Sequence, residues 1–473
     1  MKYYITTTLP YVNAEPHIGF ALEIMQADAI ARWHRQQGDD VFFNTGTDEH
    51  GLKIYRNAIK QNKDPQEYCD EYAVKFDDLK KALNLSYDNF IRTTDEHHIK
   101  AAQEFWKKCE EKGDIYKKNY KIKYCVGCEL EKTESELEND KCLIHPNLDL
   151  EVIEEENYFF KYSNYKDRLL ELYKNNKNFV IPNFRLKEIA NFTEKGLEDF
   201  SVSRLKEKMP WGIPVPGDDK HVMYVWFDAL INYISCLGWP DNLEKFNEYW
   251  PGVQVAGKDN LRQQSSMWQA MLLSAGLSTS KQIFIHGFIN AKGGQKMSKS
   301  LGNVIDPFEM VEKYGTDPLR YYLLRHINPV EDSEFDEERF PEKYNADLAN
   351  GLGNLVARIS NLLEKNNIEI NIKINSDQEL KNEFNQKMSD YKFNEALEVL
   401  WNKLRKCDEI ITREQPWKLD DKNKIKDILE PIAQNILNVA ELLSPFMPTI
   451  SEKIINQFLE KQIKKQDPLF PRI

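Results

Sequence analysis

Two short motifs carry side chains that could bind a polyphosphate. The first is Pro16-His17-Ile18-Gly19-Phe20, and the second, about 280 residues later, is Lys296-Met297-Ser298-Lys299-Ser300. A histidine and a glycine at a strand-to-helix turn suit an anion, and so do lysines and serines on a short loop that follows a strand. A lysine–serine run alone is usually a solvated loop, and a single His-x-Gly is weaker still. Together, in this order, the two motifs predict a site that holds ATP from two sides.

Four potential metal ligands form two pairs. Cys125-x-x-Cys128 is followed, after thirteen intervening residues, by Cys142-x-x-His145. Three thiolates and one imidazole suit the tetrahedral coordination of Zn²⁺, and four protein ligands fill its shell, so the spacing predicts one structural zinc site. Such a metal contributes on the order of 10 kcal/mol of local folding free energy. The alternatives are three unrelated buried cysteines or a redox Cys-x-x-Cys pair, which here lacks its usual thioredoxin-like context.

The size and composition of the chain exclude several classes of protein. Its 473 residues, 41% of them hydrophobic, predict roughly two to four domains with large cores. The net charge of −12 argues against binding nucleic acid through a bulk positive potential, although a local basic face would be enough for RNA. Seven cysteines, only three of them clustered, argue for a reducing cytosol. Because there is no signal-peptide pattern and no apolar run near the ~20 residues of a membrane span, we expect a soluble cytoplasmic protein with no membrane partner.

The elements around the first phosphate motif alternate between strand and helix. Residues 3–8 are β-branched and aromatic, which predicts a strand, and residues 18–35 carry one apolar stripe, which predicts a helix. A short buried strand then runs into the polar segment 45–51. This βαβ pattern predicts an open, doubly wound (Rossmann-like) parallel sheet. Ligands of such sheets bind beyond the carboxyl ends of the strands, which is where we expect His17 and Asp48.

The pattern of the chain changes at four places. Residues 116–205 hold the cysteine cluster, a charged stretch and mixed strands, which we interpret as an insertion into the sheet domain. Strands are then predicted at 222–226, at 253–257 before a helix that opens at Asp259, and at 282–287 before the Lys296 loop. The predicted segments are 1–115 and 206–290 for the two halves of the nucleotide-binding catalytic domain, 116–205 for the zinc-bearing insertion, 291–345 for a linking segment with the lysine loop, and 346–473 for a helical domain.

The last segment has a wholly helical periodicity. Its apolar stripes run from Leu348 to Leu363, Phe393 to Ile411, Ile425 to Leu443 and Ile450 to Phe458. They predict an all-α C-terminal bundle. The predicted fold class is therefore an α/β doubly wound catalytic domain with a zinc-bearing insertion, joined to a helical bundle.

Several motifs, in their order along the chain, resemble those of methionyl-tRNA synthetases, a family of class I aminoacyl-tRNA synthetases. They are Leu9-Pro10-Tyr11-Val12-Asn13, His17-Ile18-Gly19, the four-ligand cluster, Val225-Trp226-Phe227-Asp228-Ala229, Gly257-Lys258-Asp259, the Lys296–Ser300 run and Gln415-Pro416-Trp417. The two phosphate motifs alone identify only class I, whereas the cysteine cluster, the tryptophan motif and the bundle narrow the resemblance to methionine. The chain also has no room for the large editing insertion of the leucine, isoleucine and valine enzymes.

The resemblance implies a reaction and a set of site residues. Methionine and ATP would form methionyl-adenylate and pyrophosphate, and the methionyl group would pass to tRNA(Met), with Mg²⁺ accompanying ATP. The implied catalytic residues are His17, Lys296 and Lys299. ATP would also contact Gly19, Gly257, Lys258, Asp259 and His286. Methionine would bind among Leu9, Tyr11, Asp48, Trp226, Ala229, Tyr233, Gln264 and Trp268, with Asp48 on the α-ammonium. The anticodon would be read by Asn354, Arg358 and Trp417 at the helical bundle, which is thereby an anticodon-binding domain.

Each of these residues also has a plainer interpretation. His17 or Asp259 could simply cap a helix, Asp48 could be a turn residue, Trp417 could pack after Pro416, and Arg358 could lie on a solvated face. The aromatic residues of the methionine set could be ordinary core residues.

The sequence departs from the family pattern at two places. Phe20 stands where the fourth signature residue is commonly histidine, and Gln263-Gln264 stand where an aromatic residue and a histidine are common. Loss of one phosphate donor can cost ~10²–10³ in rate. The alternatives are another class I synthetase, such as the cysteine enzyme, or a catalytically inactive RNA-binding or zinc-binding paralogue. Because the sequence lacks the extra C-terminal domain that makes some relatives dimeric, we expect a monomer.

Overall fold

Six parallel strands form the central sheet of the computed structural model, in the order β3-β2-β1-β14-β15-β9. Their bounds are Lys2–Thr7 (β1), Asp40–Thr47 (β2), Asn89–Arg92 (β3), Val180–Ile181 (β9), Val253–Gly257 (β14) and Gln282–His286 (β15). The strand order runs outward from β1 in one direction and from β14 in the other, so the predicted doubly wound sheet is confirmed. In such sheets the crevice for ligands opens at the carboxyl ends of the two central strands.

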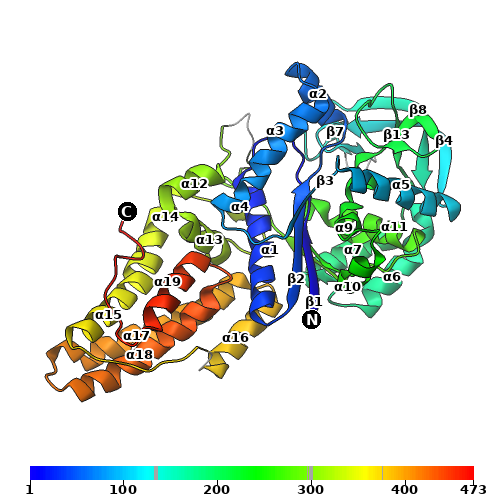
Figure 1. Ribbon diagram of the computed structural model, residues 1–473. Helices are drawn as coiled ribbons and strands as arrows, with labels where there is room; N and C mark the ends of the chain where they lie inside the picture. The colour runs from blue at the N-terminus through cyan, green and yellow to red at the C-terminus, as the bar shows by residue number, and fades with distance from the viewer. Residues whose placement is uncertain (133–136, 296, 298–301, 375–376) are drawn as a thin grey trace. The chain divides into compact units, whose positions relative to one another are not determined.

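The structure describes residues 1–132, 137–295, 297, 302–374 and 377–473. They form two compact units, each of which is described by itself. Unit 1 comprises residues 1–16, 39–80 and 87–286 and contains the parallel sheet, and unit 2 comprises residues 17–38, 81–86 and 287–473 and is almost wholly helical (Figure 1).

The strands of unit 1 are buried because helices cover the sheet. Strand β14 is buried along its whole length, as expected of a central parallel strand with helices on both faces. In the core, the rings of Phe105 and Trp268 stack with their centroids 5.6 Å apart. The helices of this unit are α2 (Leu52–Lys60), α3 (Pro65–Asp77), α5 (Glu96–Glu111), α6 (Lys166–Asn175), α7 (Asn183–Lys195), α8 (Val225–Ala229), α9 (Asn232–Ser235), α10 (Leu243–Tyr249) and α11 (Trp268–Ser274), and α4 (Leu79–Ala82) leads from this unit into the next.

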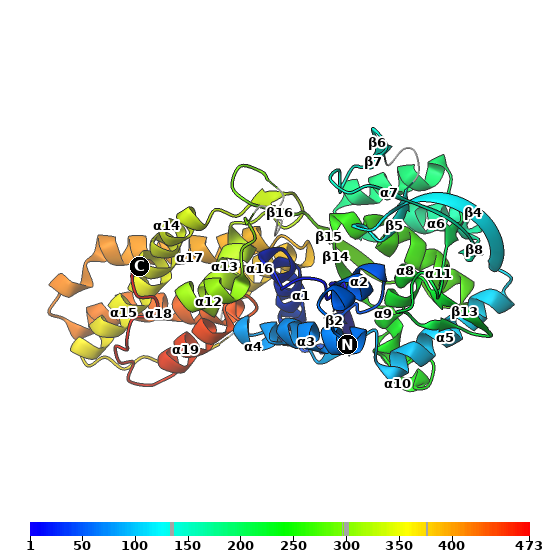
Figure 2. The same cartoon turned by 90° about the horizontal axis from the view of Figure 1, so that it is seen from above.

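Antiparallel strands form the region of the predicted insertion. One sheet has the order β10-β8-β4-β5, with β4 at Ile115–Cys125, β5 at Leu130–Lys132, β8 at Glu151–Phe160 and β10 at Phe200–Ser201. A second sheet has the order β11-β13-β12, at Ser203–Leu205, Asp218–Met223 and Pro214–Val215, and the hairpin of β6 (Leu137–Glu138) and β7 (Lys141–Cys142) projects at one end of unit 1 (Figure 2). Strand β9 pairs with β15, so the chain returns to the parallel sheet within the predicted insertion.

The prediction of a strand at 222–226 is wrong in two respects: the strand ends earlier, and it belongs to an antiparallel sheet and not to the parallel one. Strand β13 ends at Met223, and Val225 already begins helix α8. Met223 pairs with Ser203 in the antiparallel sheet, whereas the N–H of Asp228 bonds back to the carbonyl of Tyr224. The β-branched and aromatic run favours a strand locally, but its two halves contact different partners. These tertiary contacts, and not the local propensity, determine the secondary structure.

Unit 2 contains the predicted helical bundle. Helices α15 (Asn354–Lys365), α16 (Gln378–Ser389), α17 (Phe393–Glu414), α18 (Lys422–Leu443) and α19 (Pro448–Phe458) pack side by side (Figures 1 and 2). The predicted apolar stripes face inward, since Leu363, Leu400, Ile436 and Ile454 are completely buried. The unit also holds α1 (Ile18–Gln36), α12 (Pro307–Tyr314), α13 (Thr316–Arg325), α14 (Phe340–Lys343) and the strand pair β16 (Ile289–Asn290) and β17 (Ser333–Glu334). No helix within the described ranges is long and apolar enough to cross a membrane.

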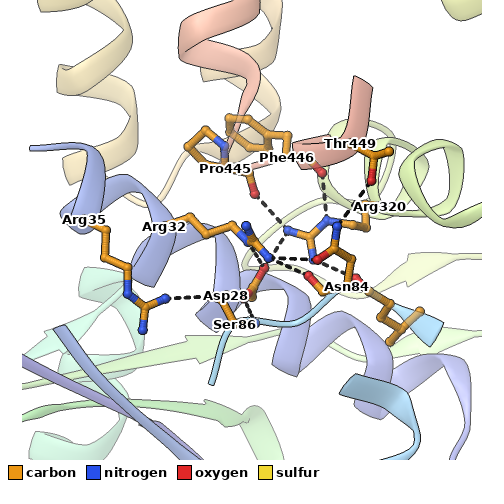
Figure 3. Close-up of polar contacts among 10 residues, drawn as sticks. Asp28, Arg32, Arg35, Asn84, Ser86, Arg320, Pro445, Phe446 and Thr449 are labelled. Carbon is orange, nitrogen blue, oxygen red and sulfur yellow. Dashed lines mark hydrogen bonds and ion pairs between the residues drawn. The ribbon is translucent and has the colours of Figure 1, made fainter. Parts of the chain in front are cut away.

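A buried ion pair joins the distant parts of unit 2. The carboxylate of Asp28 in α1 lies 2.7 Å from the guanidinium of Arg320 in α13, and both side chains are fully buried (Figure 3). The same guanidinium donates to the carbonyl oxygens of Leu83, Pro445 and Phe446 at 2.8–3.0 Å. Arg320 thereby ties the first helix of the chain to the turn between α18 and α19.

Candidate functional site

Three residues predicted to bind ATP meet at the carboxyl ends of β14 and β15. Gly257 pairs with His286 across the two strands, and Asp259 follows in a short 3₁₀ turn. A Cβ atom built on Gly257 would lie 2.8 Å from Asp259 Oδ1 and 3.6 Å from His286 Cε1, so a larger residue at position 257 would displace the Asp259 carboxylate. Asp259 is exposed while His286 is buried, which presents a carboxylate acceptor at an open strand end, as ribose hydroxyls require.

His17 lies at the N-terminus of α1, in unit 2. Its backbone is extended (φ −133°, ψ 169°), and its Nδ1 accepts a 3.1 Å hydrogen bond from the N–H of Gly19. A Cβ atom on residue 19 would lie 2.9 Å from His17 Cε1, so the glycine is required by this cap. Because Nδ1 accepts, the proton of the neutral ring is on Nε2, which makes that atom a donor. The capping interpretation of His17 is therefore correct, and it is compatible with a phosphate contact.

The predicted lysines of the second motif, Lys296 and Lys299, lie outside the described residues. Just before them, Gly293 and Gly294 adopt positive φ angles of 81° and 72°. Such angles are open to glycine and strained for most other residues.

Two adjacent acids at the carboxyl end of β2 have different surroundings. Glu49 is fully buried and is paired by Arg92, whose Nε and Nη2 donate to its two oxygens at 2.6 and 2.8 Å. Asp48 is equally buried, but among the described residues no cation pairs with it. Burial raises the pKa of Asp48 well above its ordinary value, and the negative charges of Asp228 and Glu129 add to this rise. The carboxyl group of Asp48 therefore lies where a cation from a ligand would be strongly favoured.

The aromatic side chains of the predicted methionine set form two pairs, one of which lies beside Asp48. Tyr11 forms a β-bridge with Asp48, and its ring meets that of Trp226 edge-on at 6.3 Å. The rings of Tyr233 and Trp268 form a second edge-on pair, at 5.9 Å. Tyr11 Oη, Trp226 Nε1 and Trp268 Nε1 are all buried and have no hydrogen-bond partner among the described residues. Buried polar atoms are usually hydrogen-bonded, so these three are candidates for contact with a ligand.

The remaining residues of the predicted methionine set belong to the same region of unit 1. Ala229 lies one helical turn after Trp226 in α8, so both project from one face. Leu9 packs against the core cluster that contains Tyr233 and Trp268. Gln264 donates a 2.7 Å hydrogen bond from Nε2 to Tyr233 Oη. The structure thus brings the second aromatic pair and Gln264 together, whereas Tyr11 and Trp226 belong to a smaller neighbouring cluster.

An ion network not anticipated from the sequence lies beneath α8. Asp228 is fully buried, and its two oxygens contact His50 Nδ1 at 2.7 Å and His98 Nε2 at 2.9 Å. Burial alone would raise the pKa of Asp228, but the two histidines hold it below its ordinary value. This network fixes α8, and with it Trp226, to the loop that carries Asp48.

Glu129, immediately after the metal ligand Cys128, connects the cysteine cluster to the same loop. Its Oε1 accepts a 2.7 Å hydrogen bond from the N–H of Lys53 in the first turn of α2. The N-cap of that helix is Gly51, which has no side chain to serve this purpose. Tyr124 donates its hydroxyl to the same carboxylate. Glu129 therefore supplies an N-terminal cap to α2 from a segment that is distant in the sequence.

The four predicted metal ligands converge as expected. One ligand atom from each of Cys125, Cys128, Cys142 and His145 can be chosen so that all lie within 4.8 Å of one another. Cys128 Sγ lies 3.5 Å from Cys142 Sγ, and Cys125 Sγ lies 3.8 Å from His145 Nδ1. Zn–S bonds of about 2.3 Å in a tetrahedron place two sulfurs about 3.8 Å apart, so the cluster fits zinc.

Local backbone features shape this cluster. Asn139 and Asp140 have positive φ angles of 52° and 60° and form the two-residue turn that joins β6 to β7, the strand that contains Cys142. Such turns favour Asn and Asp at both central positions. A Cβ atom on Gly127 would lie 2.7 Å from His145 Cγ, so the glycine between the first two ligands lets the histidine approach.

The three residues predicted to read an anticodon lie on the surface of unit 2. Asn354 begins α15 and Arg358 lies one turn later. The guanidinium carbon of Arg358 lies 4.6 Å from the ring centroid of Trp417, and the same side chain pairs with Asp408 at 3.2 Å. Trp417 is 45% exposed, which is unusual for tryptophan and leaves an aromatic face on which a base could stack.

Sequence reasoning missed the residues that act through distant partners. His50 stands inside the polar segment 45–51 and Asp228 stands inside the quoted tryptophan motif, so their positions were a usable signal. Glu129, next to a zinc ligand, offered a weaker one. Gln254 and Ser280, which are hydrogen-bonded to the Gln264 region, have no local signal at all.

Comparisons with known proteins place the chain among the aminoacyl-tRNA synthetases. The family model "tRNA synthetases class I (M)" matches residues 3–134 and 127–360, and the model "Anticodon-binding domain of tRNA ligase" matches residues 374–471. A methionine–tRNA ligase from Thermotoga maritima is 42% identical over 98% of this chain and 77% of its own length, and one from Nostoc sp. is 41% identical over 96% of this chain and 89% of its own.

A solved structure resembles the whole chain. It is the Mycobacterium tuberculosis methionyl-tRNA synthetase in complex with methionyl-adenylate, which is 35% identical and superposes with a TM-score of 0.94, covering 100% of both chains. The matched motifs, the sheet topology and these similarities over the full length all indicate the same family. The chain belongs to the methionyl-tRNA synthetase family of class I aminoacyl-tRNA synthetases.

Proposed function

We propose that this protein ligates L-methionine to tRNA(Met) in two ATP-dependent steps. In the first, a carboxylate oxygen of methionine attacks the α-phosphorus of ATP, and the bond to the bridging oxygen of the β-phosphate breaks to release pyrophosphate. In the second, a terminal ribose hydroxyl of the tRNA attacks the carbonyl carbon of the adenylate, and AMP leaves. Neither step needs a nucleophile from the protein, so positioning and charge stabilisation suffice.

The observation that carries the proposal is the buried carboxyl group of Asp48, which has no cationic partner among the described residues. Its charged neighbours Asp228 and Glu129 are also acids, so they do not neutralise it. The α-ammonium group of an amino acid would supply the missing positive charge. Aromatic walls suit a polarizable thioether, and Tyr11 and Trp226 lie beside Asp48 with buried polar atoms that have no partner among the described residues. A small amino acid with an apolar, polarizable side chain is the ligand that these features fit together.

ATP would be held by residues of both phosphate motifs. His17 Nε2 would donate to a phosphate oxygen, and Lys296 and Lys299 would supply positive charge. Asp259, which lies beside Gly257 and His286 at the ends of their strands, would accept from the ribose hydroxyls. Mg²⁺ bound with ATP would neutralise further phosphate charge.

The other parts of the chain would serve the same reaction. Zn²⁺ bound by Cys125, Cys128, Cys142 and His145 would stabilise the segment that contains these four residues. The anticodon would be read by Asn354, Arg358 and Trp417. We further propose that the protein acts in the cytoplasm as a monomer.

Amino-acid-dependent ATP–pyrophosphate exchange tests the proposal directly. Each standard amino acid is assayed in parallel with purified, zinc-loaded protein. Exchange with methionine alone is the expected result. Exchange with a different amino acid would keep the reaction and overturn the methionine assignment, and no exchange from folded protein would indicate an inactive RNA-binding paralogue.

A further inference from the structure

The loop that carries Asp48 is contacted by Trp211, which lies between β11 and β12. This loop joins β2 to α2. Trp211 Nε1 donates a 2.6 Å hydrogen bond to the carbonyl of Glu49. The carbonyl of Trp211 accepts from the N–H of Gly51 at 3.4 Å, and the indole lies beside the imidazole of His50, with the ring centroids 5.6 Å apart. Trp211 therefore contacts each of the three residues that follow Asp48.

The segment that holds Trp211 is itself fixed to β13. The N–H of Met223 donates to the carbonyl of Ile213 at 2.7 Å, and Ile213 is buried. A Cβ atom on Gly212 would lie 3.3 Å from Val222 Cβ, so the segment runs close against the strand. Trp211 thus contacts the Asp48 loop from a segment that is packed on a strand.

One peptide group joins the Trp211 contact to the carboxylate of Asp48. The carbonyl of Glu49 and the N–H of His50 belong to the same trans peptide, in which the two groups point in opposite directions. The carbonyl accepts from Trp211 and, at 3.4 Å, from the thiol of Cys69. The N–H lies 3.5 Å from Asp48 Oδ1. Holding the carbonyl on one side therefore directs the N–H toward Asp48 on the other.

This N–H acts on the charge of Asp48. Burial raises the pKa of the carboxyl group, and the negative charges of nearby acids, Asp228 foremost, add to the rise. The hydrogen bond from the N–H of His50 lowers the same pKa, because it favours the ionised form. An ionised carboxylate is the form that pairs with an ammonium group, so the orientation of this one peptide affects the affinity for a cationic ligand.

We propose that Trp211 is a positioning residue: it holds the peptide after Glu49 so that its N–H donates to the carboxylate of Asp48, the group that would bind the α-ammonium of methionine. This inference rests on the proposed function, because it takes Asp48 as the ammonium site. Its new content is the role of Trp211, which lies 162 residues after Glu49 and outside the motifs that carry the family resemblance.

The Trp211→Phe variant keeps an aromatic ring and removes the donor. We expect the KM for methionine, measured by ATP–pyrophosphate exchange, to rise roughly two- to tenfold, the range of one neutral hydrogen bond. The KM for ATP should not change, because Asp48 is assigned to methionine and not to ATP. Trp211→Met also removes the donor, with a flexible side chain, and should give the same result, so one folded variant of the two is enough for the test.

A double-mutant cycle with Asp48→Asn separates positioning from a merely structural role. If Trp211 acts through the Asp48 carboxylate, Trp211→Phe should have no further effect on the KM for methionine once that carboxylate is gone. The matched control is Trp33→Phe, because Trp33 is another partly buried tryptophan whose Nε1 donates one hydrogen bond, to Asn385 Oδ1 at 2.9 Å in unit 2. This control should leave the KM for methionine unchanged.

The outcomes separate this inference from the proposed function. If the wild-type protein exchanges with methionine and neither variant of Trp211 raises the KM for methionine, the positioning role is overturned and the function stands. Equal factors in the wild-type and Asp48→Asn backgrounds, or equal rises for methionine and ATP, would show a role independent of Asp48 and would also overturn it. If the wild-type protein does not exchange with methionine, the proposed function itself fails.

Discussion

Replacing Arg320 with methionine should strongly destabilise unit 2. The side chain is fully buried and donates to one carboxylate and three backbone carbonyls. Methionine fills a similar volume and can donate to none of them. Burial alone would raise the pKa of Asp28, but Arg320 and Arg32 hold it below its ordinary value, so Asp28 is ionised at neutral pH and loses a partner in the variant.

The expected loss follows from the contacts that remain. Asp28 keeps Arg32 Nε at 2.8 Å and two bonds from Ser86, so its charge is not left alone. The three carbonyl groups lose a charged donor, at a cost of about 1–3 kcal/mol for each one that finds no new partner. Removing one member of a buried ion pair costs about 3–5 kcal/mol in other proteins, and we expect the free energy of unfolding to fall by a similar amount. Arg320→Lys, which keeps the charge but not the planar fork, should lose roughly half as much.

Urea unfolding followed by far-ultraviolet circular dichroism measures this loss. The control is Arg413→Met in α17, because Arg413 pairs only at the surface with Glu414 and its side chain is 73% exposed. The control should stay within about 0.5 kcal/mol of the wild-type protein. A loss below about 1 kcal/mol for Arg320→Met would refute the reasoning, since it would mean that the ion pair does not hold α1 to the turn after α18.

Further predictions concern the site and its supports. Asp48→Asn should raise the KM for methionine about 10- to 100-fold in pyrophosphate exchange, the value of one charge-assisted hydrogen bond, and an unchanged KM would remove Asp48 from the ammonium site. The same variant should be more stable than the wild-type protein at neutral pH: burial raises the pKa of Asp48, so ionisation above the unfolded pKa of about 4 favours unfolding, and the gain should vanish below that pH in thermal melts. Cys142→Ser should lower the zinc content, measured by elemental analysis, and weaken methionine binding through Glu129; normal methionine binding without zinc would contradict that link. Trp417→Ala should lower kcat/KM for tRNA by roughly 5- to 100-fold while pyrophosphate exchange stays normal, because one stacked base contributes about 1–3 kcal/mol.

The parts of the site that could be predicted from the sequence are those set by local spacing. The four predicted metal ligands lie in two short segments with Cys-x-x-Cys and Cys-x-x-His spacing, and the structure brings these side chains together. The strand ends that carry Asp48, Gly257 and His286 follow from the alternation of strands and helices, because parallel strands end at one edge of a sheet. Gly19 is fixed by its neighbour His17, two residues away.

The parts that could not be predicted depend on partners far away in the chain. Helix α1 was predicted from its stripe of Leu22, Met25, Ala29 and Trp33, yet it also buries Asp28 completely. An aspartate in the middle of a helix usually signals a solvated face, and its partner Arg320 is 292 residues later. The strand predicted at 222–226 failed for the same reason, since local propensity cannot show that Asp228 turns inward to two histidines.

Asp48 and Glu49 show what decides between structure and function when two like residues are adjacent. Both are acids, both are buried, and both lie at the carboxyl end of the same strand, so their types and positions do not separate them, and only the family resemblance singles out Asp48. The structure supplies Arg92 to Glu49 and three acids to the surroundings of Asp48. A buried charge with a protein partner is compensated within the fold, whereas one surrounded by like charges raises the free energy of the empty site, and a cationic ligand removes that cost on binding. The residue that the fold leaves uncompensated is therefore the better candidate for binding, and at this strand end it is Asp48.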